Sequence, residues 1–349
     1  MSQQWTSRLG HILAATGSAV GIGAIWKFSY VSATNGGGAF LIVFLLFSFV
    51  IGLAVLLAEN ILGSSTSEVA VNAFKKLMGL TCYVVLSGVQ RGLEKAAKVM
   101  MPMLFLIMIM LIIVGIRLPG SSEGLKLFLY PDFSSLTGKG VLDALGSYLP
   151  DNKGICRSSI WVVILSCLVC ILAGLMIFPA LAAAGLKPNA GPGLTFMTMP
   201  IYFASLPGGS ILAVTFFLLL LMAALTSAIS LLEHIVAYVQ SRFKWRRRKA
   251  GLAVTASIML MGIPVSLSFG PLSHLTLCGK TIFDMLDFVT SNVLMPLFGI
   301  IICLVFGWSQ KANALMPENM PLRSRQCLMF IWRYVGPLCI GVILVHGLI

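Results

Sequence analysis

The sequence predicts an all-α fold, a polytopic membrane bundle with about eight transmembrane helices. Of the 349 residues, 58% are hydrophobic and only 10% are charged, whereas soluble domains carry about 25% charged residues. The mean hydropathy is +0.98. Apolar runs of 18 residues or more, the length at which a helix crosses a bilayer, recur along the whole chain.

Each long apolar run predicts one membrane helix. The eight runs lie at residues 9–33, 39–63, 96–117, 158–182, 209–239, 251–268, 286–308 and 328–348. A further apolar stretch, TCYVVLSGV at 81–89, is too short to cross a bilayer alone.

The first run is interrupted in the middle by glycines. Gly17, Gly21 and Gly23 stand where a plain membrane anchor would carry leucine. Backbone opens at membrane depth only where it lines a cavity or is buried in protein. A broken membrane helix therefore predicts a binding site, as in secondary transporters.

Basic residues gather in short clusters between the apolar runs, which predicts cytoplasmic loops at 64–98, 241–249 and before the last helix. The N-terminus is then cytoplasmic, in a multi-pass protein of the plasma (cell inner) membrane. The cluster RFKWRRRK at 242–249 is read as a topology anchor, with lipid headgroup binding as the alternative. The net charge of +13 thus predicts contact with the lipid bilayer and no nucleic-acid partner.

The charge pattern conflicts with the count of helices at one place. Loop 241–249 is cytoplasmic only if the chain crosses the bilayer once between residues 118 and 157. No run there is long and apolar enough for a helix. Leaving backbone groups unpaired in lipid costs several kcal/mol each, and inverting the rest of the chain would move six basic residues to the wrong side.

The residues give no sign of an enzyme. No nucleophile beside a base, metal-binding cluster or phosphate-cradling loop is present, and the four histidines are scattered through different segments. Cys167 and Cys170 form a CxxC without a second pair, so they are read as packing residues.

Four motifs carry a resemblance to a known family. They are SRLGHILAATGSAVGIGAIWKF at 7–28 with NGGGAF at 35–40, Glu59 in LLAEN, GLEKAAKVMMPMLF at 92–105, and AALTSAISLLEHIVAY at 223–238. Together they resemble the neurotransmitter:sodium symporters, whose fold is called LeuT-type, and the bacterial branch above all. The resemblance covers nearly the whole chain.

The resemblance implies an incomplete LeuT-type inverted repeat. The chain passes from AFKKLMG at 73–79 to the tail of the fourth family helix, so the third and most of the fourth are absent. LDALG at 142–146 resembles the entry to the sixth helix and SYLP at 147–150 its exit, which removes one crossing where the charge count fails. The chain is then one transporter domain: remnants of the first repeat (1–117) and second repeat (118–308), then a cytoplasmic loop and last helix (309–349).

The resemblance also implies a sodium site. Its ligands would be the carbonyls of Gly17, Val20 and Ala223 and the hydroxyls of Thr226 and Ser227. These residue types suit sodium, a hard cation that takes oxygen ligands. The alternative is that Thr226 and Ser227 bond back to carbonyls one turn earlier.

A second sodium site of the family looks damaged, because Ala24 stands where an Asn is usual and Ser166 near where an Asn or Asp is usual. The implied substrate residues are Ser18, Ile22 and Gly23, whose N–H groups at a half-helix start suit a carboxylate.

Lys27 and Asp287 resemble the family's extracellular gate pair, with Lys27 in place of the usual Arg. The alternative for Lys27 is a snorkelling side chain that reaches the interface. Glu59 is an intramembrane carboxylate and needs a partner.

The implied function is sodium-coupled symport of amino acids or related small amines by alternating access, impaired by the internal deletions. Na⁺ is the coupling ion, an amino-acid-like solute is the partner, and no organic cofactor is expected. The sequence leaves open whether the protein forms a homo-oligomer. The alternative is a degenerate, non-transporting membrane protein, or a fragment that associates with an intact relative.

Overall fold

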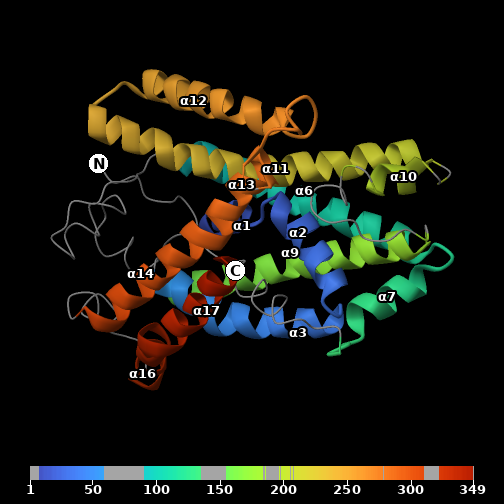
Figure 1. The fold of residues 1–349 in the computed structure, drawn as a ribbon, viewed down its shortest axis with the longest axis horizontal. Helices are drawn as coiled ribbons and strands as arrows, with labels where there is room; N and C mark the ends of the chain where they lie inside the picture. The colour runs from blue at the N-terminus through green and yellow to red at the C-terminus, as the bar shows by residue number, and fades with distance from the viewer. Residues whose placement is uncertain are drawn as a thin grey trace. The chain divides into compact units, whose positions relative to one another are not determined.

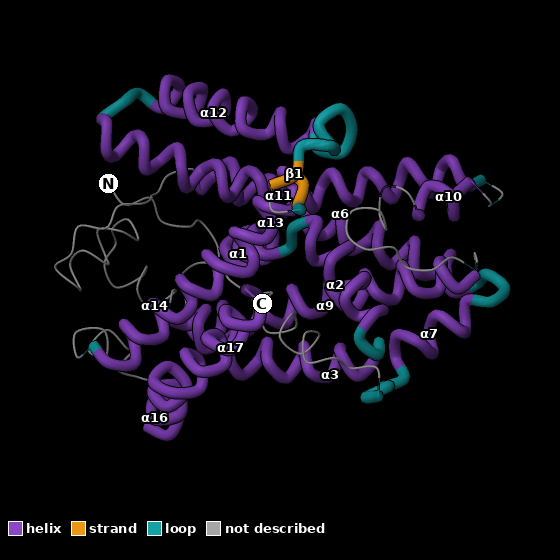
Figure 2. The backbone as a smooth tube through the Cα atoms, in the orientation of Figure 1, coloured by secondary structure: helices purple, strands orange, loops and turns teal. Residues whose placement is uncertain are grey.

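The computed structural model describes residues 8–58, 90–134, 155–183, 185, 196, 198–204, 206, 208–277, 279–309 and 322–348. The described part is helical almost throughout (Figure 2). It contains one short hairpin, in which β1 (Thr276–Leu277) pairs antiparallel with β2 (Lys280–Thr281). The all-α prediction is confirmed.

The helices follow one another along the colour gradient of Figure 1. In chain order they are α1 (Arg8–Ala19), α2 (Ile22–Thr34), α3 (Gly38–Phe47), η1 (Ser48–Gly52), α6 (Gln90–Ile116), α7 (Ser121–Leu129), α9 (Ile155–Ala183), α10 (Met199–Ala204), α11 (Gly209–Phe243), α12 (Arg247–Leu267), α13 (Ile282–Asp287), η3 (Phe288–Leu294), α14 (Met295–Trp308), α16 (Leu322–Phe330), η4 (Ile331–Val335) and α17 (Gly336–Leu348). The three η segments are π-helical turns inside longer helices.

All eight predicted membrane helices are found among the described residues. Seven helices are long and apolar enough to cross a bilayer, and the bent pair α1–α2 makes the eighth. The seven are Gly38–Ala58, Ala97–Ile116, Ser158–Ala183, Gly209–Gln240, Arg247–Leu267, Ile282–Trp308 and Leu322–Leu348.

The chain divides into two compact units. One comprises residues 4–56 and 90–230, and the other residues 1–3, 57–89 and 231–349. The division into repeat remnants is a statement about ancestry, which these units do not test, and it stays a prediction.

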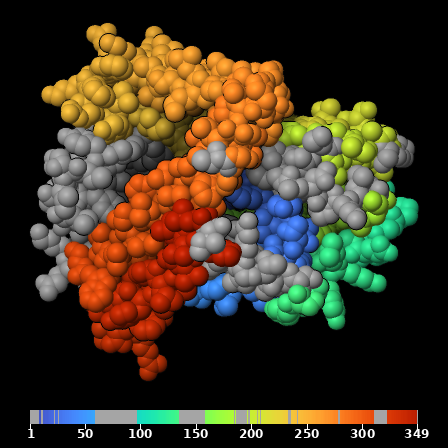
Figure 3. Space-filling model, in the orientation of Figure 1, coloured from blue at the N-terminus to red at the C-terminus, as the bar shows by residue number. Residues whose placement is uncertain are grey.

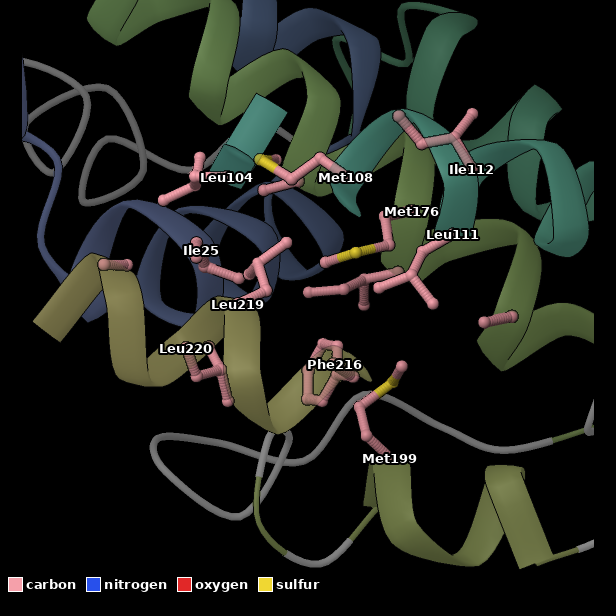
Figure 4. Packing of buried hydrophobic residues seen from close by; sticks show 14 of the residues in the cluster. Ile25, Leu104, Met108, Leu111, Ile112, Met176, Met199, Phe216, Leu219 and Leu220 are labelled. Carbon is pink, nitrogen blue, oxygen red and sulfur yellow. The ribbon is translucent and has the colours of Figure 1, made fainter. Parts of the chain in front are cut away.

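Two apolar clusters hold the first unit together. The larger joins α1, α2, α6, α9, α10 and α11, and Figure 4 shows Leu104, Met108, Met176 and Phe216 converging within it. The second joins α1, α2, α3, α7 and α9 around a group of phenylalanines. Phe28 lies at its centre, with ring centroids 4.8 Å from Phe44, 5.7 Å from Phe40 and 6.4 Å from Phe128.

Helices α6 and α9 run side by side in the same direction (Figure 1). Their C-terminal ends lie together, because a Cβ atom on Gly115 would be 3.7 Å from the Met176 carbonyl oxygen. Just past the end of α6, a Cβ atom on Gly120 would lie 3.5 Å from the Ala183 Cα. The two helices therefore run in the same direction, which is the relation that the sequence predicts for them.

Helix α7 turns back along α9 and packs closely against it. A Cβ atom on Gly124 would lie 2.1 Å from the Phe178 carbonyl oxygen, and Phe128 fills the space beside Gly174. Helix α9 begins at Ile155, 19 residues before Gly174. At 1.5 Å per helical residue, its start therefore lies about 29 Å along the helix axis from the contact with Phe128. Residues 135–154, where the sequence predicts a missing crossing, lie outside the described residues.

Helix α11 runs opposite to α6 and α9. Near its start, Leu212 lines one small cavity together with Leu111, Val114, Met176 and Ala180, which belong to the C-terminal ends of those two helices. The part of α11 that belongs to the first unit, up to residue 230, therefore runs back toward the starts of α6 and α9. The side on which the basic residues 242–249 lie stays a prediction.

The second unit contains α12, α13, α14, α16 and α17. Helix α12 follows α11 after three residues and packs on it through a small cluster of Val236, Ala250 and Val254. Helices α14 and α17 lie side by side (Figure 1), and Gly299 faces Ile340 across their contact.

Candidate sodium site

The first membrane helix is broken where the glycines predict it. Helix α1 ends at Ala19, α2 begins at Ile22, and the two halves are bent by 73°. Gly21 caps α2 in an extended conformation (φ −89°, ψ −178°), and no side chain caps it.

The break leaves carbonyl groups without their usual helical donors. The Val20 N–H donates to the Thr16 carbonyl at 2.7 Å, whereas the Gly21 N–H donates to Ala19 at 3.1 Å. The Ala24 N–H donates to Gly21 at 3.1 Å. Among the described residues, no backbone N–H donates to the carbonyl of Gly17 or of Val20. Their oxygens are of the kind that hard cations take as ligands.

Helix α11 packs directly against this break. A Cβ atom on Gly17 would lie 3.2 Å from the Thr226 Cβ, and one on Gly21 would lie 3.5 Å from the Ser227 Oγ. The first distance is tighter than ordinary packing and favours glycine at position 17, whereas the second is an ordinary van der Waals contact. The Ser227 hydroxyl donates to the Ser18 carbonyl at 3.2 Å, across 209 positions of sequence.

The residues around the break are buried among apolar side chains. Val20 and Ala223 are fully buried in the same apolar cluster, and Thr226 is 3% exposed. Low polarity around oxygen ligands strengthens their attraction for a cation. The five predicted sodium residues thus lie on two segments that touch, α1 with its break and one turn of α11.

The two hydroxyl groups differ in what they do. Thr226 donates to the carbonyls of Met222 at 3.1 Å and Ala223 at 3.0 Å, which is the back-bonding alternative. Ser227 does not bond back but crosses to Ser18. A hydroxyl oxygen keeps its lone pairs while it donates its proton, so both oxygens can still coordinate a cation.

The predicted substrate residues lie on both sides of the break. Ser18 belongs to the last turn of α1, and Ile22 and Gly23 open α2, where N–H groups have no intrahelical acceptor. A Cβ atom on Gly23 would meet no described atom within 4 Å. No described residue therefore covers the Gly23 side of the break. Ala24 is half-buried against both apolar clusters and supplies no side-chain oxygen.

Four buried hydroxyl groups of this unit have no hydrogen-bond partner in the described structure, those of Thr16, Ser48, Ser158 and Ser166. Thr16 on α1 is fully buried next to Gly17, and Ser166 on α9 is 2% exposed.

The predicted gate residues belong to different units, so their pairing stays a prediction. Lys27 is half-buried on α2. Asp287 ends α13, and its Oδ1 accepts a hydrogen bond from Ser291 Oγ at 2.9 Å. Glu59 lies outside the described residues.

Comparison with a known protein family identifies the chain. The sequence model described as "Sodium:neurotransmitter symporter family" matches residues 2–81, 77–141 and 133–349. The chain belongs to the sodium:neurotransmitter symporter family. The resemblance inferred from the four motifs is confirmed.

Bacterial relatives of this symporter family match from end to end. An uncharacterized sodium-dependent transporter of Bacillus subtilis, YhdH, is 34% identical over 98% of this chain and 97% of its own length. One from Haemophilus influenzae is 28% identical over 99% of this chain and 98% of its own. The crystal structure of MhsT in complex with L-phenylalanine is 33% identical, covers 99% of both chains and has a TM-score of 0.86. The LeuT-type fold is confirmed.

The same alignments show that this chain is internally shorter than its relatives. The Bacillus alignment extends over 437 residues, whereas this chain has 349. Since both proteins are covered almost completely, the difference lies inside the chain. The matched segments meet at 77–81, where the third and fourth helices are predicted to be missing. They meet again at 133–141, a few residues before the predicted junction at 146–147.

Proposed function

We propose that this symporter-family chain binds Na⁺ at the broken first helix and is a sodium-coupled symporter of amino acids or related amines, impaired by its internal deletions. The observation that carries the proposal is the contact of Gly17, Ser18 and Gly21 with Thr226 and Ser227. This contact brings the carbonyl groups of the helix break, at Gly17 and Val20, near the two hydroxyl groups of α11.

The donor set suits sodium rather than a transition metal. The carbonyls of Gly17, Val20 and Ala223 and the hydroxyls of Thr226 and Ser227 are five oxygens without a carboxylate or thiolate. Hard cations prefer such oxygens, and soft ones prefer sulfur and imidazole. The ion would join α1 to α11, and its inward movement supplies about 2.3 kcal/mol per charge at 100 mV.

The substrate class follows from the opening of α2 and from one relative. Ile22 and Gly23 lie in the first turn of α2, and their N–H groups belong to the positive end of a half-helix, which favours a carboxylate. MhsT, 33% identical, was solved with L-phenylalanine. An α-amino acid would present its carboxylate to this end of α2.

The impairment follows from what the site lacks. No described atom lies within 4 Å of a Cβ atom on Gly23, and Ala24 offers no side-chain oxygen for a second ion. In the family the third and sixth helices complete the pocket, and the shortened chain is predicted to lack both. A non-transporting protein is the second candidate, favoured by the internal shortfall itself.

Uptake into proteoliposomes tests the coupled activity. With an inward sodium gradient and labelled phenylalanine, leucine or alanine, we expect accumulation close to that of empty liposomes. MhsT, which was solved in complex with L-phenylalanine, is reconstituted in the same way as the comparison for the assay. Robust sodium-dependent accumulation by this chain alone would contradict the impairment and leave the symporter assignment standing.

A further inference from the structure

The membrane span Ile282–Trp308 consists of two unlike halves. Helix α13 (Ile282–Asp287) and the π-helical turn η3 (Phe288–Leu294) form the first half, and α14 (Met295–Trp308) forms the second. Figure 3 shows this span, in orange, at the surface of the molecule. The two halves differ in how firmly the rest of the second unit holds them.

Helix α14 is fixed by close packing on α17 and η4. A Cβ atom on Gly336 would lie 2.8 Å from the Cys303 Sγ, so the two helices meet with little space between them. At the end of α14, the Arg333 Nε donates to the Gly307 carbonyl at 2.6 Å. Contacts of this kind oppose any independent movement of α14.

Helix α13 and the η3 turn are packed far less tightly. None of their residues, all of which the structure describes, is buried. The C-terminal part of η3 is held to α17, because Asn292 Nδ2 donates to the Gly347 carbonyl at 3.2 Å and a Cβ atom on Gly347 would lie 3.1 Å from the Asn292 Cβ. The span can therefore bend before Asn292.

Helix α13 and the β1–β2 hairpin form one body beyond this point. The Thr281 hydroxyl donates to Asp284 Oδ2 at 2.7 Å, and its oxygen accepts from the Asp284 N–H at 3.2 Å, which caps α13 at the end of the hairpin. The rings of Phe269 and Phe283 lie 4.8 Å apart. We call α13 and the hairpin the outer arm.

A single hydroxyl group joins η3 to the outer arm. Thr290 Oγ1 donates to the carbonyls of Leu286 at 2.7 Å and Asp287 at 3.2 Å, the last two residues of α13. Threonine bonds of this kind bend helices, and π-helical turns are among the few places where helices kink sharply. Thr290 thus connects the two sides of the bend.

The turn η4 shows what a fixed π-helical turn looks like in the same unit. Its Trp332 is fully buried, with its ring 5.4 Å from that of Phe306 on α14. No side chain of η3 is anchored in this way. The difference in burial, rather than the π-helical geometry itself, distinguishes a turn that can bend from one that cannot.

We propose that η3 is a hinge about which the outer arm moves relative to α14. A few residues that absorb a change in backbone angles suffice for such a motion. The arm carries Asp287, the acidic member of the predicted gate pair, so the hinge sets the position of that carboxylate. This inference goes beyond the proposed sodium-coupled transport, and its test does not depend on ion binding.

The motion should be measurable at the tip of the arm. Leu277, in the hairpin, pairs with Lys280, which precedes η3 by eight residues, or about 12 Å along a helix. A change of about 20° in the kink would move this tip by about 4 Å. Double electron–electron resonance between spin labels resolves a displacement of this size.

Two label pairs on the full chain, in a background without the native cysteines, give the comparison. Leu277→Cys with Val345→Cys connects the arm to α17 across η3. Leu322→Cys with Leu304→Cys connects α16 to α14 across the buried turn η4 and is the matched control. All four side chains are exposed. Thr290→Val removes the hydroxyl and keeps the shape of the side chain, and Thr290→Ser keeps the hydroxyl.

We expect a broader distance distribution for the 277–345 pair than for the 304–322 pair. Thr290→Val should broaden the first distribution further, Thr290→Ser should leave it as in the parent chain, and neither should change the control pair. Equal widths for the two pairs in the parent chain would overturn the hinge. A broad 277–345 distribution that Thr290→Val leaves unchanged would place the motion in the hairpin and overturn it as well.

Discussion

At the scale of single residues, Gly17 is the point on which the α1–α11 contact depends. Its missing side chain lets Thr226 approach, and a Cβ atom would also lie 3.4 Å from the Met101 sulfur. Gly251 on α12 is the opposite case, because a Cβ atom there would meet no described atom within 4 Å. Replacing each glycine by alanine therefore distinguishes the effect of helix propensity, at Gly251, from the effect of close packing, at Gly17.

Gly251→Ala should stabilise the protein by up to about 1 kcal/mol, the usual advantage of alanine over glycine inside a helix. Gly17→Ala should lose that advantage to overpacking, which typically costs about 1–3 kcal/mol, and should weaken any stabilisation by sodium. Thermal unfolding in detergent, with and without sodium, measures both effects. An unchanged sodium effect in Gly17→Ala would show that the contact with Thr226 is not part of the ion site.

At the scale of elements, α7 is fixed to α9 by close backbone contact at Gly124. A Cβ atom there would lie 2.1 Å from the Phe178 carbonyl oxygen, which belongs to backbone and cannot move aside as a side chain would. Gly124→Ala should therefore destabilise the protein by about 1–3 kcal/mol. Ser122→Ala, exposed on the same helix, should be neutral within about 0.5 kcal/mol. Equal unfolding temperatures of the two variants would contradict the packing of α7.

The directions of α9 and α11 predict the sides on which their ends are found. Since Gly120 lies beside Ala183, cysteines at Glu123 and Gly185 should react with an impermeant reagent from the same, outer side. A cysteine at Arg248, beyond the end of α11, should react only from the opposite side. A background without the native cysteines gives the measurement. Labelling of all three positions from one side would refute the arrangement.

The sequence predicts membrane elements well because their signals are local. Apolar length marks each span, and Gly17, Gly21 and Gly23 mark the break. Helix α7 and the π-helical turns carry no such local signal and were not predicted. The contact of Ser18 with Ser227 spans 209 positions, so only the family resemblance, not spacing, pointed to it. The contact of α9 with α6 shows that the two helices run in the same direction, but residues 135–154 lie outside the described part of the chain, so the missing crossing stays a prediction.

At the scale of the whole molecule, the chain keeps the fold of its family with fewer residues. It matches MhsT with a TM-score of 0.86. It has 349 residues, whereas its alignment with the Bacillus relative extends over 437 positions. The α1–α11 contact survives this shortening, because both segments lie in one compact unit. We therefore expect the chain to retain ion binding more fully than solute transport.

The most direct measurement is thermal unfolding of the full chain in sodium against potassium at equal ionic strength. Binding to the folded state stabilises by RT ln(1 + [L]/Kd), about 1.4 kcal/mol at tenfold saturation. Sodium should therefore raise the unfolding temperature, and Thr226→Ala with Ser227→Ala should abolish the difference. Thr215→Ala, a threonine nearer the start of α11 that also bonds back to its own helix, should preserve it. No shift in the parent chain, or a shift that survives the double substitution, would contradict the sodium site.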